Sequence, residues 1–190
     1  MRPQRDPRVI TVLGTLFAKF KHSQRGLAAV EFAILLPVMV LFYLGSYQIS
    51  DAIGADRMTT LAASTVANIT TQYSTISASN DMPGILDAAA TVLTPYNVAN
   101  AKITVSLINI SANGSATVGW SQSMNGTARI VGSSVTVPPA LDTPNTSLVF
   151  GEVTYAYTPL YDYLNLGTVN LYQSVYMLPR SQSGTITLTP

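Results

Sequence analysis

One acidic side chain, Glu31, interrupts the apolar run between Leu27 and Ser50. An acidic group within a membrane helix costs about 2.5–3.5 kcal/mol on insertion scales, so it normally has a function and a partner. In an apolar surrounding, a carboxylate can neutralise a cation on a neighbouring chain. Alternatively, Glu31 lies close enough to the membrane interface to reach water.

Few other side chains have the types that catalysis needs. The chain has no cysteine, and its one histidine, His22, precedes the apolar run. Disulfides, thiolate nucleophiles and zinc ribbons are therefore excluded, and no histidine-based triad is possible beyond residue 26. A serine–lysine dyad would need Lys102, which has no serine signature around it.

Carboxylate pairs are the remaining catalytic possibility. Two pairs, whose spacing does not require them to meet, are Asp81 with Asp87 and Glu152 with Asp162. No phosphate loop, dinucleotide fingerprint or calcium loop occurs. The sequence therefore predicts no enzyme, no cofactor and no metal site, and a hydrolase using carboxylates is kept as an alternative.

Charge divides the chain near Gly26. Residues 1–26 carry six basic and one acidic side chain, whereas residues 27–190 carry four basic and eight acidic ones. No long basic face follows the basic segment, which argues against nucleic acid as a partner. The positive-inside rule instead predicts a membrane helix with a cytoplasmic N-terminus and its C-terminal bulk outside. At about 1.5 Å per residue, residues 27–50 are long enough to span about 30 Å of hydrocarbon.

A cleavable secretory signal is the main alternative to a membrane helix. Its apolar core would be about 7–15 residues long and would end in a small-x-small cleavage site. The run here is longer and passes beyond Asp51 into an amphipathic helical pattern.

The elements that must position these residues begin with one long helix, over about Leu27–Tyr73. Its second half has an apolar stripe expected to pack on a domain, formed by Met58, Leu61, Val66, Ile69 and Tyr73. Pro37 has no backbone N–H to donate to the carbonyl of Ala33 and is expected to kink the helix. The kink either helps the helix to bend as the chain enters a filament, or it has no function and Pro37 is an ordinary proline of a membrane helix.

Residues 74–190 are expected to form a small α+β domain. Residues 74–80 are predicted to be a loop, and a short helix follows from Asp81 to before Pro95. The period then changes to two, and Asn113-Gly114 predicts a hairpin. The predicted strands lie near residues 103–108, 116–120, 134–137, 148–157, 169–177 and 185–188. The fold class is therefore α+β, with a long N-terminal helix packed on a small antiparallel sheet.

Tyrosines are concentrated towards the C-terminus. Four lie in predicted strands, where the two in each strand share one parity, and are expected to pack against the long helix: Tyr155 with Tyr157, and Tyr172 with Tyr176. Tyr161 and Tyr163 follow Pro159 in a predicted turn, and they are the better candidates for contact with another subunit.

One stretch resembles the type IV prepilin processing site, in which a basic leader and a glycine precede an apolar helix with glutamate at its fifth position. This stretch is Arg25-Gly26-Leu27-Ala28-Ala29-Val30-Glu31-Phe32. The continuation Ala33-Ile34-Leu35-Leu36-Pro37 is similar to the TadE-like minor pilins of the tight-adherence (Tad, Flp) pilus. The segments Tyr155–Leu160 and Met177–Arg180 also resemble the C-terminal part of TadE-like proteins. The resemblance is strong over residues 25–50, weaker over 51–75 and patchy thereafter.

This resemblance implies cleavage between Gly26 and Leu27 by a membrane prepilin peptidase. The new amine on Leu27 would be a cation near the interface, since the pKa of an α-amino group is ordinarily about 7.7–8.0. In an assembling filament, it would pair with Glu31 of a neighbouring subunit and set the register, with Phe32 beside it. The other implied partners are further minor pilins, the major pilin, the inner-membrane assembly platform and membrane lipid.

The sequence therefore predicts a minor pilin with four parts. These are a basic cytoplasmic leader (residues 1–26), a transmembrane helix (27–50), its amphipathic extension (51–73) and a periplasmic or extracellular domain (74–190). The expected location is the bacterial inner membrane, with a single pass, and then the pilus at the cell surface, where it serves adhesion. The alternative is a permanently membrane-anchored periplasmic binding or adhesive module that never enters a filament.

Overall fold

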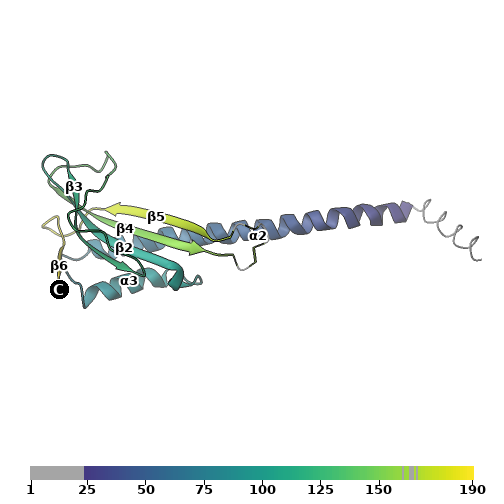
Figure 1. The fold of residues 1–190 in the computed structure, drawn as a ribbon, viewed down its shortest axis with the longest axis horizontal. Coiled ribbons are helices and arrows are strands. Elements are labelled where there is room, and N and C mark those ends of the chain that lie inside the picture. Colours follow the sequence, from purple (N-terminus) through teal and green to yellow (C-terminus); the bar gives the residue numbers. More distant parts are fainter. Residues whose placement is uncertain (1–23, 160, 163–164, 166) are drawn as a thin grey trace, which may run out of the picture. The chain divides into compact units, whose positions relative to one another are not determined.

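The computed structural model describes residues 24–159, 161, 162, 165 and 167–190, so most of the predicted leader lies outside the described residues. The elements in chain order are helix α2 (Gln24–Thr71), strand β1 (Thr75–Ser77), helix α3 (Asp81–Thr91), 3-10 helix η1 (Val98–Asn100) and strands β2 (Ala101–Ile110), β3 (Ala116–Met124), β4 (Thr146–Tyr157), β5 (Val169–Met177) and β6 (Thr187–Thr189) (Figure 1). The chain divides into two compact units between Tyr47 and Gln48, and helix α2 contributes to both.

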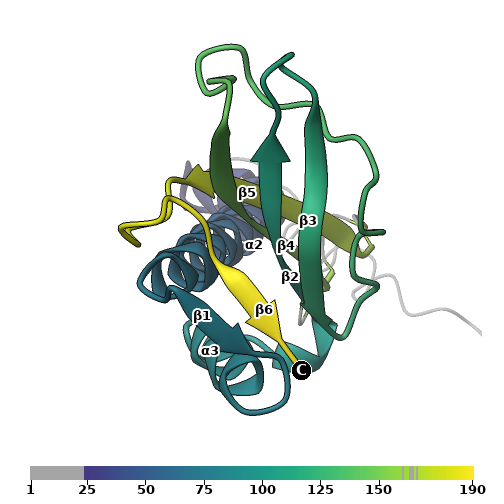
Figure 2. The same cartoon turned by 90° about the vertical axis from the view of Figure 1, so that its left-hand side faces the viewer.

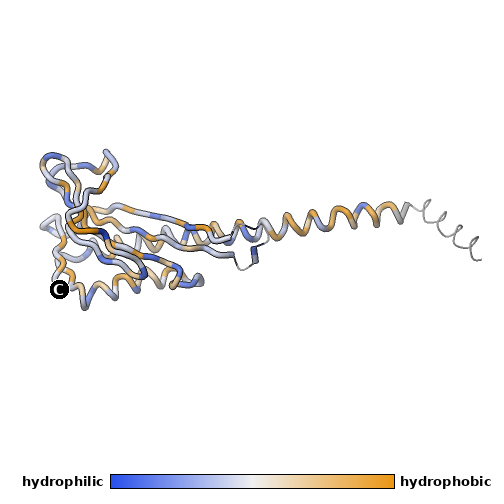
Figure 3. Tube along the Cα trace, in the orientation of Figure 1, coloured by the Kyte–Doolittle hydropathy of each residue, from blue (hydrophilic) through white to orange (hydrophobic). Residues whose placement is uncertain are grey.

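The described part of the first unit is the N-terminal half of α2. Its large apolar side chains are mostly exposed, including Leu27 at 63% and Phe42 at 74%, and apolar colouring dominates this part of the tube (Figure 3). In the part of the chain that the structure describes, α2 is the helix long and apolar enough to cross a membrane. A helix that is apolar all round without being packed in protein has the character of a membrane span.

The second unit contains a four-stranded antiparallel sheet, ordered β3-β2-β4-β5. The C-terminal half of α2 packs on one face of this sheet (Figure 2). The predicted class is therefore confirmed: the fold is α+β, with a long N-terminal helix and a small antiparallel sheet. Helix α3 adds Met82, Ile85 and Leu86 to the same core.

The helix packs through small side chains rather than through the predicted stripe. The buried positions include Ala55, Ala62, Ala63, Val66 and Ala67. Of the five predicted stripe residues, Val66 alone is buried, Met58 and Ile69 are half-buried, and Leu61 and Tyr73 are exposed. The prediction was wrong for Leu61 because the buried face of α2 is formed mainly by alanines at other positions, and for Tyr73 because the helix ends at Thr71.

Gly151 on β4 is where the approach is closest. A Cβ atom built on Gly151 would lie 2.7 Å from the carbonyl oxygen of Ala63 and 3.1 Å from Cβ of Ala67. The contact on the helix side is partly backbone, which cannot rotate away. The close packing of β4 on α2 therefore requires both a glycine on the strand and alanines on the helix.

Two predictions about the strands were wrong. Residues 74–80 contain β1, which pairs in parallel with β6 to form a second, two-stranded sheet. Residues 134–137 form no strand, and Ser134 makes an isolated bridge with Thr117. Strands of three residues are too short to show alternation, and β1 forms because Ile76 is fully buried in the core while its backbone pairs with β6.

The tyrosine prediction was half right. Tyr155 and Tyr157 on β4 are buried on the helix-facing side, whereas Tyr172 on β5 is 53% exposed. In the sheet, Thr154 pairs with Tyr172 and Phe150 with Tyr176. Paired residues share a face, so both β5 tyrosines lie on the opposite side from α2. Parity within a strand does not tell which face of the sheet meets the helix.

A hydrogen-bonded link ties α2 to the domain at Asp51. Its Oδ2 accepts a bond from the hydroxyl of Tyr157 (2.7 Å), and its Oδ1 accepts one from the hydroxyl of Tyr96 (3.0 Å). Tyr157 lies at the end of β4, and Tyr96 follows α3. In the sequence, Asp51 is merely one polar residue of an amphipathic helix, whereas the structure makes it a point of attachment.

Asp51→Ala is expected to lower the free energy of unfolding by about 1.5–3 kcal/mol, because Tyr157 and Tyr96 lose a carboxylate acceptor, while Tyr96 keeps its bond to the backbone carbonyl of residue 51 (3.0 Å). Urea unfolding of the full chain in detergent, followed by the fluorescence of Trp120, the single tryptophan, measures this. Asp87→Ala on α3 is the matched control, since Asp87 is exposed and surface changes stay within about 0.5 kcal/mol. Equal stability of the two variants would contradict the role of Asp51.

Candidate processing and assembly site

The residues proposed for processing lie at the start of α2. The helix begins at Gln24, so Gly26 and Leu27 are within it, although the side chains of residues 24–26 are not described. Leu27 and Glu31 are four residues apart, which places them on one helix face with Cβ atoms about 5–6 Å apart. Both side chains are exposed. Cleavage after Gly26 would place the new amine on the backbone nitrogen of Leu27, about one helical turn before the exposed Glu31 side chain.

Phe32 and Pro37 follow in the same helix. Phe32 is exposed, like its apolar neighbours, so it is available to pack against another apolar helix. Helix α2 continues through Pro37. The kink expected there stays a prediction, since continuous helical backbone is compatible with a straight or a bent axis.

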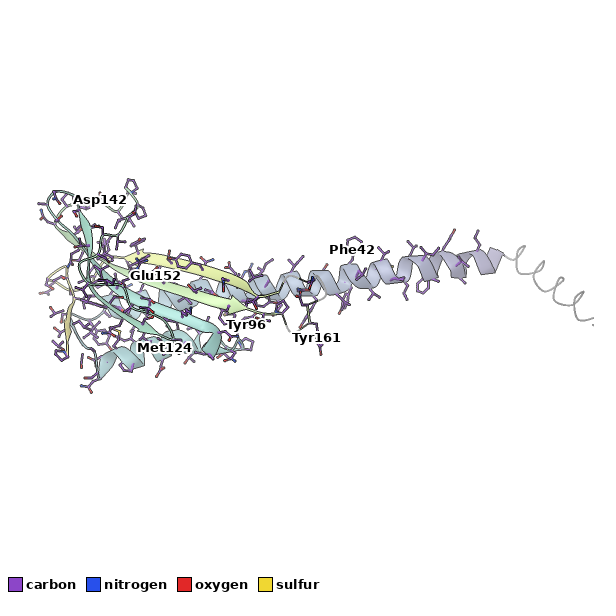
Figure 4. All side chains as sticks on the ribbon, in the orientation of Figure 1. Phe42, Tyr96, Met124, Asp142, Glu152 and Tyr161 are labelled. Carbon is purple, nitrogen blue, oxygen red and sulfur yellow. The ribbon has the colours of Figure 1, made fainter. Side chains whose placement is uncertain are left out.

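The tyrosines proposed as subunit contacts have different outcomes. Tyr161, labelled in Figure 4, is exposed, whereas Tyr163 lies outside the described residues. The neighbouring Asp162 accepts a bond from Nε2 of Gln48 (3.1 Å) and one from the backbone N–H of Gly167 (2.7 Å). These bonds tie the segment that carries Tyr161 to α2 and give this tyrosine a defined place on the surface.

Among the described residues, the hydrogen bonds and ion pairs of the carboxylates considered for catalysis go to other groups. Glu152 pairs with Arg129, while Asp162 bonds to Gln48 and Gly167. Asp81 accepts a bond from the backbone N–H of Ser77 (2.9 Å), and Asp87 is exposed. Within the described ranges, no three acidic or histidine side chains lie together as metal ligands would. Acid–base catalysis by either of the two suggested pairs is therefore not supported.

A polar cluster centred on Glu152 is the feature that sequence reasoning missed. Arg129 donates to both oxygens of Glu152, from Nε at 2.6 Å and from Nη2 at 2.7 Å, and Tyr172 donates its hydroxyl at 2.8 Å. The Arg129 guanidinium also lies 5.2 Å from the ring centre of Phe150, which stacks on Tyr176 at 4.1 Å. These side chains cover the face of the sheet opposite α2.

The charges within the cluster stabilise each other. The hydrogen bond with Glu152 raises the pKa of Arg129 above its ordinary value. Burial, followed by the hydrogen bond to Glu152, raises the pKa of Tyr172, so its hydroxyl stays protonated and donates. Burial and the nearby Glu152 charge raise the pKa of Tyr176. These upward shifts keep the Arg129 guanidinium charged and the hydroxyls of Tyr172 and Tyr176 protonated at neutral pH.

One signal in the sequence pointed towards this cluster. Glu152 stands inside a predicted strand, between apolar and small neighbours. A charge in such a strand must be paired if it is buried. The identity of the partner, Arg129, depends on the path of the chain after β3, which the pattern of residues does not encode.

Two observations define the class of protein. A single exposed apolar helix that precedes an α+β domain is consistent with a membrane-anchored, single-pass protein. Residues 26–68, most of α2, match the family described as TadE-like protein. This match confirms the resemblance over residues 26–68 and points to involvement in the Tad pilus, while the resemblance near the C-terminus stays a prediction. No curated protein and no solved structure matches the chain.

The match also bears on the function classes left open by the sequence. TadE-like proteins are structural components of a pilus and are not known as a family of enzymes. A pilin interacts with other pilus components in general. The matched segment ends at residue 68, so the sheet domain is interpreted from its own geometry.

Proposed function

We propose that the protein is a TadE-like minor pilin, made as a membrane-anchored precursor and cut after Gly26. The observation that carries this proposal is an exposed apolar helix with Glu31 one turn beyond Leu27, within the segment that matches the TadE-like family. The basic residues 1–26 hold the N-terminus in the cytoplasm. The domain then lies in the periplasm until the mature chain enters the pilus.

In the proposed assembly step, the contacts of the apolar helix with lipid are replaced by contacts with the helices of neighbouring subunits. After cleavage, the amine of Leu27 and the carboxylate of Glu31 on adjoining subunits form an ion pair in apolar surroundings. Loss of one partner of such a pair typically costs about 3–5 kcal/mol, because the other charge stays uncompensated. Apolar side chains such as Phe32, exposed in the single chain, pack on neighbouring helices. The proposed partners are a prepilin peptidase, the assembly platform and sibling pilins.

The test of processing is N-terminal sequencing of the protein extracted from membranes. The expected first residue is Leu27, and a chain that still begins at Met1 would contradict the proposal. Gly26→Phe is expected to abolish cleavage, because a bulky side chain blocks close approach of the enzyme backbone. Gly84→Phe is the matched control: Gly84 is exposed, has nothing within 4 Å of a built Cβ and lies far along the chain from Gly26. It should leave cleavage unchanged.

A permanently anchored binding module is the second candidate. The polar pocket beside Glu152 favours it, since a filament component does not require one. The two candidates differ in one measurable property: the anchored module keeps residues 1–26 and stays in the membrane fraction, whereas the pilin loses them and appears in sheared fibres.

A further inference from the structure

The sheet face opposite α2 contains a pocket of about 270 Å³. Glu152, labelled on β4 in Figure 4, lies at this face, where it bonds to Tyr172. The other lining residues that matter here are Lys102, Thr127, Arg129, Thr154 and Tyr172. Pockets for drug-sized ligands usually measure about 300–1,000 Å³, so this one has room for a single ring-sized molecule.

The floor of the pocket is formed by side chains that the strand register places next to one another. Lys102 on β2 pairs with Thr154 on β4, and Thr154 pairs with Tyr172 on β5. These three side chains therefore stand in one row on the same face. The segment after β3 covers one side of the row, fixed where the backbone N–H of Arg129 donates to Oγ of Ser121 at 3.0 Å. The pocket is thus built by rigid strands and one anchored segment.

The charge of the pocket differs from that of the domain. The pocket has two basic side chains, Lys102 and Arg129, and one acidic one, Glu152, whereas residues 74–190 carry three basic and five acidic side chains. Glu152 already accepts bonds from Arg129 and Tyr172. Among the described residues, neither Nζ of Lys102 nor Nη1 of Arg129 has a hydrogen-bond partner. Two positively charged donors therefore face the pocket with an excess charge of one, which favours an anion.

The uncharged part of the lining is made of hydroxyl groups and one aromatic ring. Thr127 and Thr154 each offer a hydroxyl that both donates and accepts. Tyr172 is 53% exposed and adds an amphipathic ring. Within the described part of the chain, no leucine, isoleucine, valine or phenylalanine side chain lines the pocket. This lining matches a small molecule that carries several hydroxyl groups and an apolar C–H face, and it offers nothing to a branched aliphatic group.

We propose that this pocket binds one acidic sugar unit, with the sugar carboxylate held by Lys102 and Arg129 and its hydroxyl groups by Thr127 and Thr154. Such a unit has the charge, the hydroxyl groups and the ring size that the pocket accommodates. Binding here does not depend on cleavage at Gly26 or on fibre assembly, so this inference and the proposed function fail or succeed separately.

The test is a calorimetric titration of the full chain in detergent with sodium glucuronate as the probe. Saturable one-to-one binding with a dissociation constant below about 10 mM is expected, and glucose should bind at least tenfold more weakly because it lacks the carboxylate. The absence of saturation with glucuronate would overturn the proposal. Equal binding of glucose would overturn the role of the two cations.

Lys102→Gln separates binding from folding, because the Lys102 side chain is exposed and its amine bonds to no described residue. It is expected to weaken glucuronate binding at least tenfold, through loss of a charge-assisted hydrogen bond, with unchanged thermal stability. Arg57→Gln, which removes an exposed cation from α2, should bind as the unchanged chain does. If both variants bind alike, the ion is attracted by overall charge and the pocket assignment is wrong.

Two further titrations test whether the pocket prefers other kinds of anionic ligand to an acidic sugar. Inorganic phosphate and N-acetylated alanylalanine, which ends in a peptide carboxylate, are both expected to bind more weakly than glucuronate, since neither supplies a ring of hydroxyl groups. Tighter binding of phosphate or of the peptide would overturn the sugar assignment.

Discussion

Glu31→Gln is expected to leave the protein in the membrane and to reduce the number of fibres per cell at least tenfold. Glutamine keeps the size of the side chain and inserts more easily into lipid, but it removes the charge proposed to neutralise the amine of Leu27. An uncompensated buried charge costs about 3–5 kcal/mol per contact, enough to shift assembly by more than a hundredfold. Counting fibres by electron microscopy, with membrane fractionation alongside, measures the effect.

Asp87→Asn is the matched control for this experiment. It makes the same carboxylate-to-amide change at an exposed position on α3, and fibre number should stay normal. Normal fibre number in Glu31→Gln as well would favour the alternative in which Glu31 simply reaches water at the interface. It would remove the ion pair from the proposed mechanism.

Gly151→Ala is expected to destabilise the domain by about 3 kcal/mol, at the upper end of the usual cost of overpacking. The added methyl group would lie 2.7 Å from the carbonyl oxygen of Ala63, so α2 must move away from the sheet. For a chain of this size, the midpoint of thermal unfolding should fall by roughly 6–12 °C. Circular dichroism of the full chain in detergent measures the shift.

Gly84→Ala provides a control of opposite sign. Nothing lies within 4 Å of a Cβ atom built at Gly84, which is inside α3. Alanine there should stabilise the chain by about 0.5–1 kcal/mol, because glycine loses more backbone entropy in a helix. If Gly151→Ala were as stable as Gly84→Ala, the close approach of helix and sheet would not be a constraint on the fold.

The boundaries of most elements could be predicted because their signals are local. The apolar run and the later helical period predicted a helix over 27–73, and α2 covers Gln24–Thr71. Alternation with an Asn-Gly turn predicted the hairpin of β2 and β3. The failures came where partners were distant: β1 is a strand through its pairing with β6, more than 100 residues later in the chain.

The candidate processing site could likewise be read from neighbouring residues. Gly26, Leu27 and Glu31 lie within six positions of one another, so their spacing along a helix follows from the sequence. The pocket around Glu152 could not be predicted, because its residues come from β2, β4, β5 and the segment after β3. A register between strands is required before Lys102, Thr154 and Tyr172 share a row.

The sequence by itself determined the uneven charge, the apolar helix with its single acid, the absence of thiol and histidine chemistry beyond residue 26 and the change from helical to alternating period. Only the tertiary structure decided which helix face meets the sheet and which sheet face remains open. The physical reason is that packing depends on how closely two surfaces approach. Gly151 packs so closely against Ala63 that only small side chains fit on this face of α2. Tyr155 lies on the same face of β4 as Gly151 and is therefore in the core, whereas Tyr172 lies on the other face with Glu152 and Arg129.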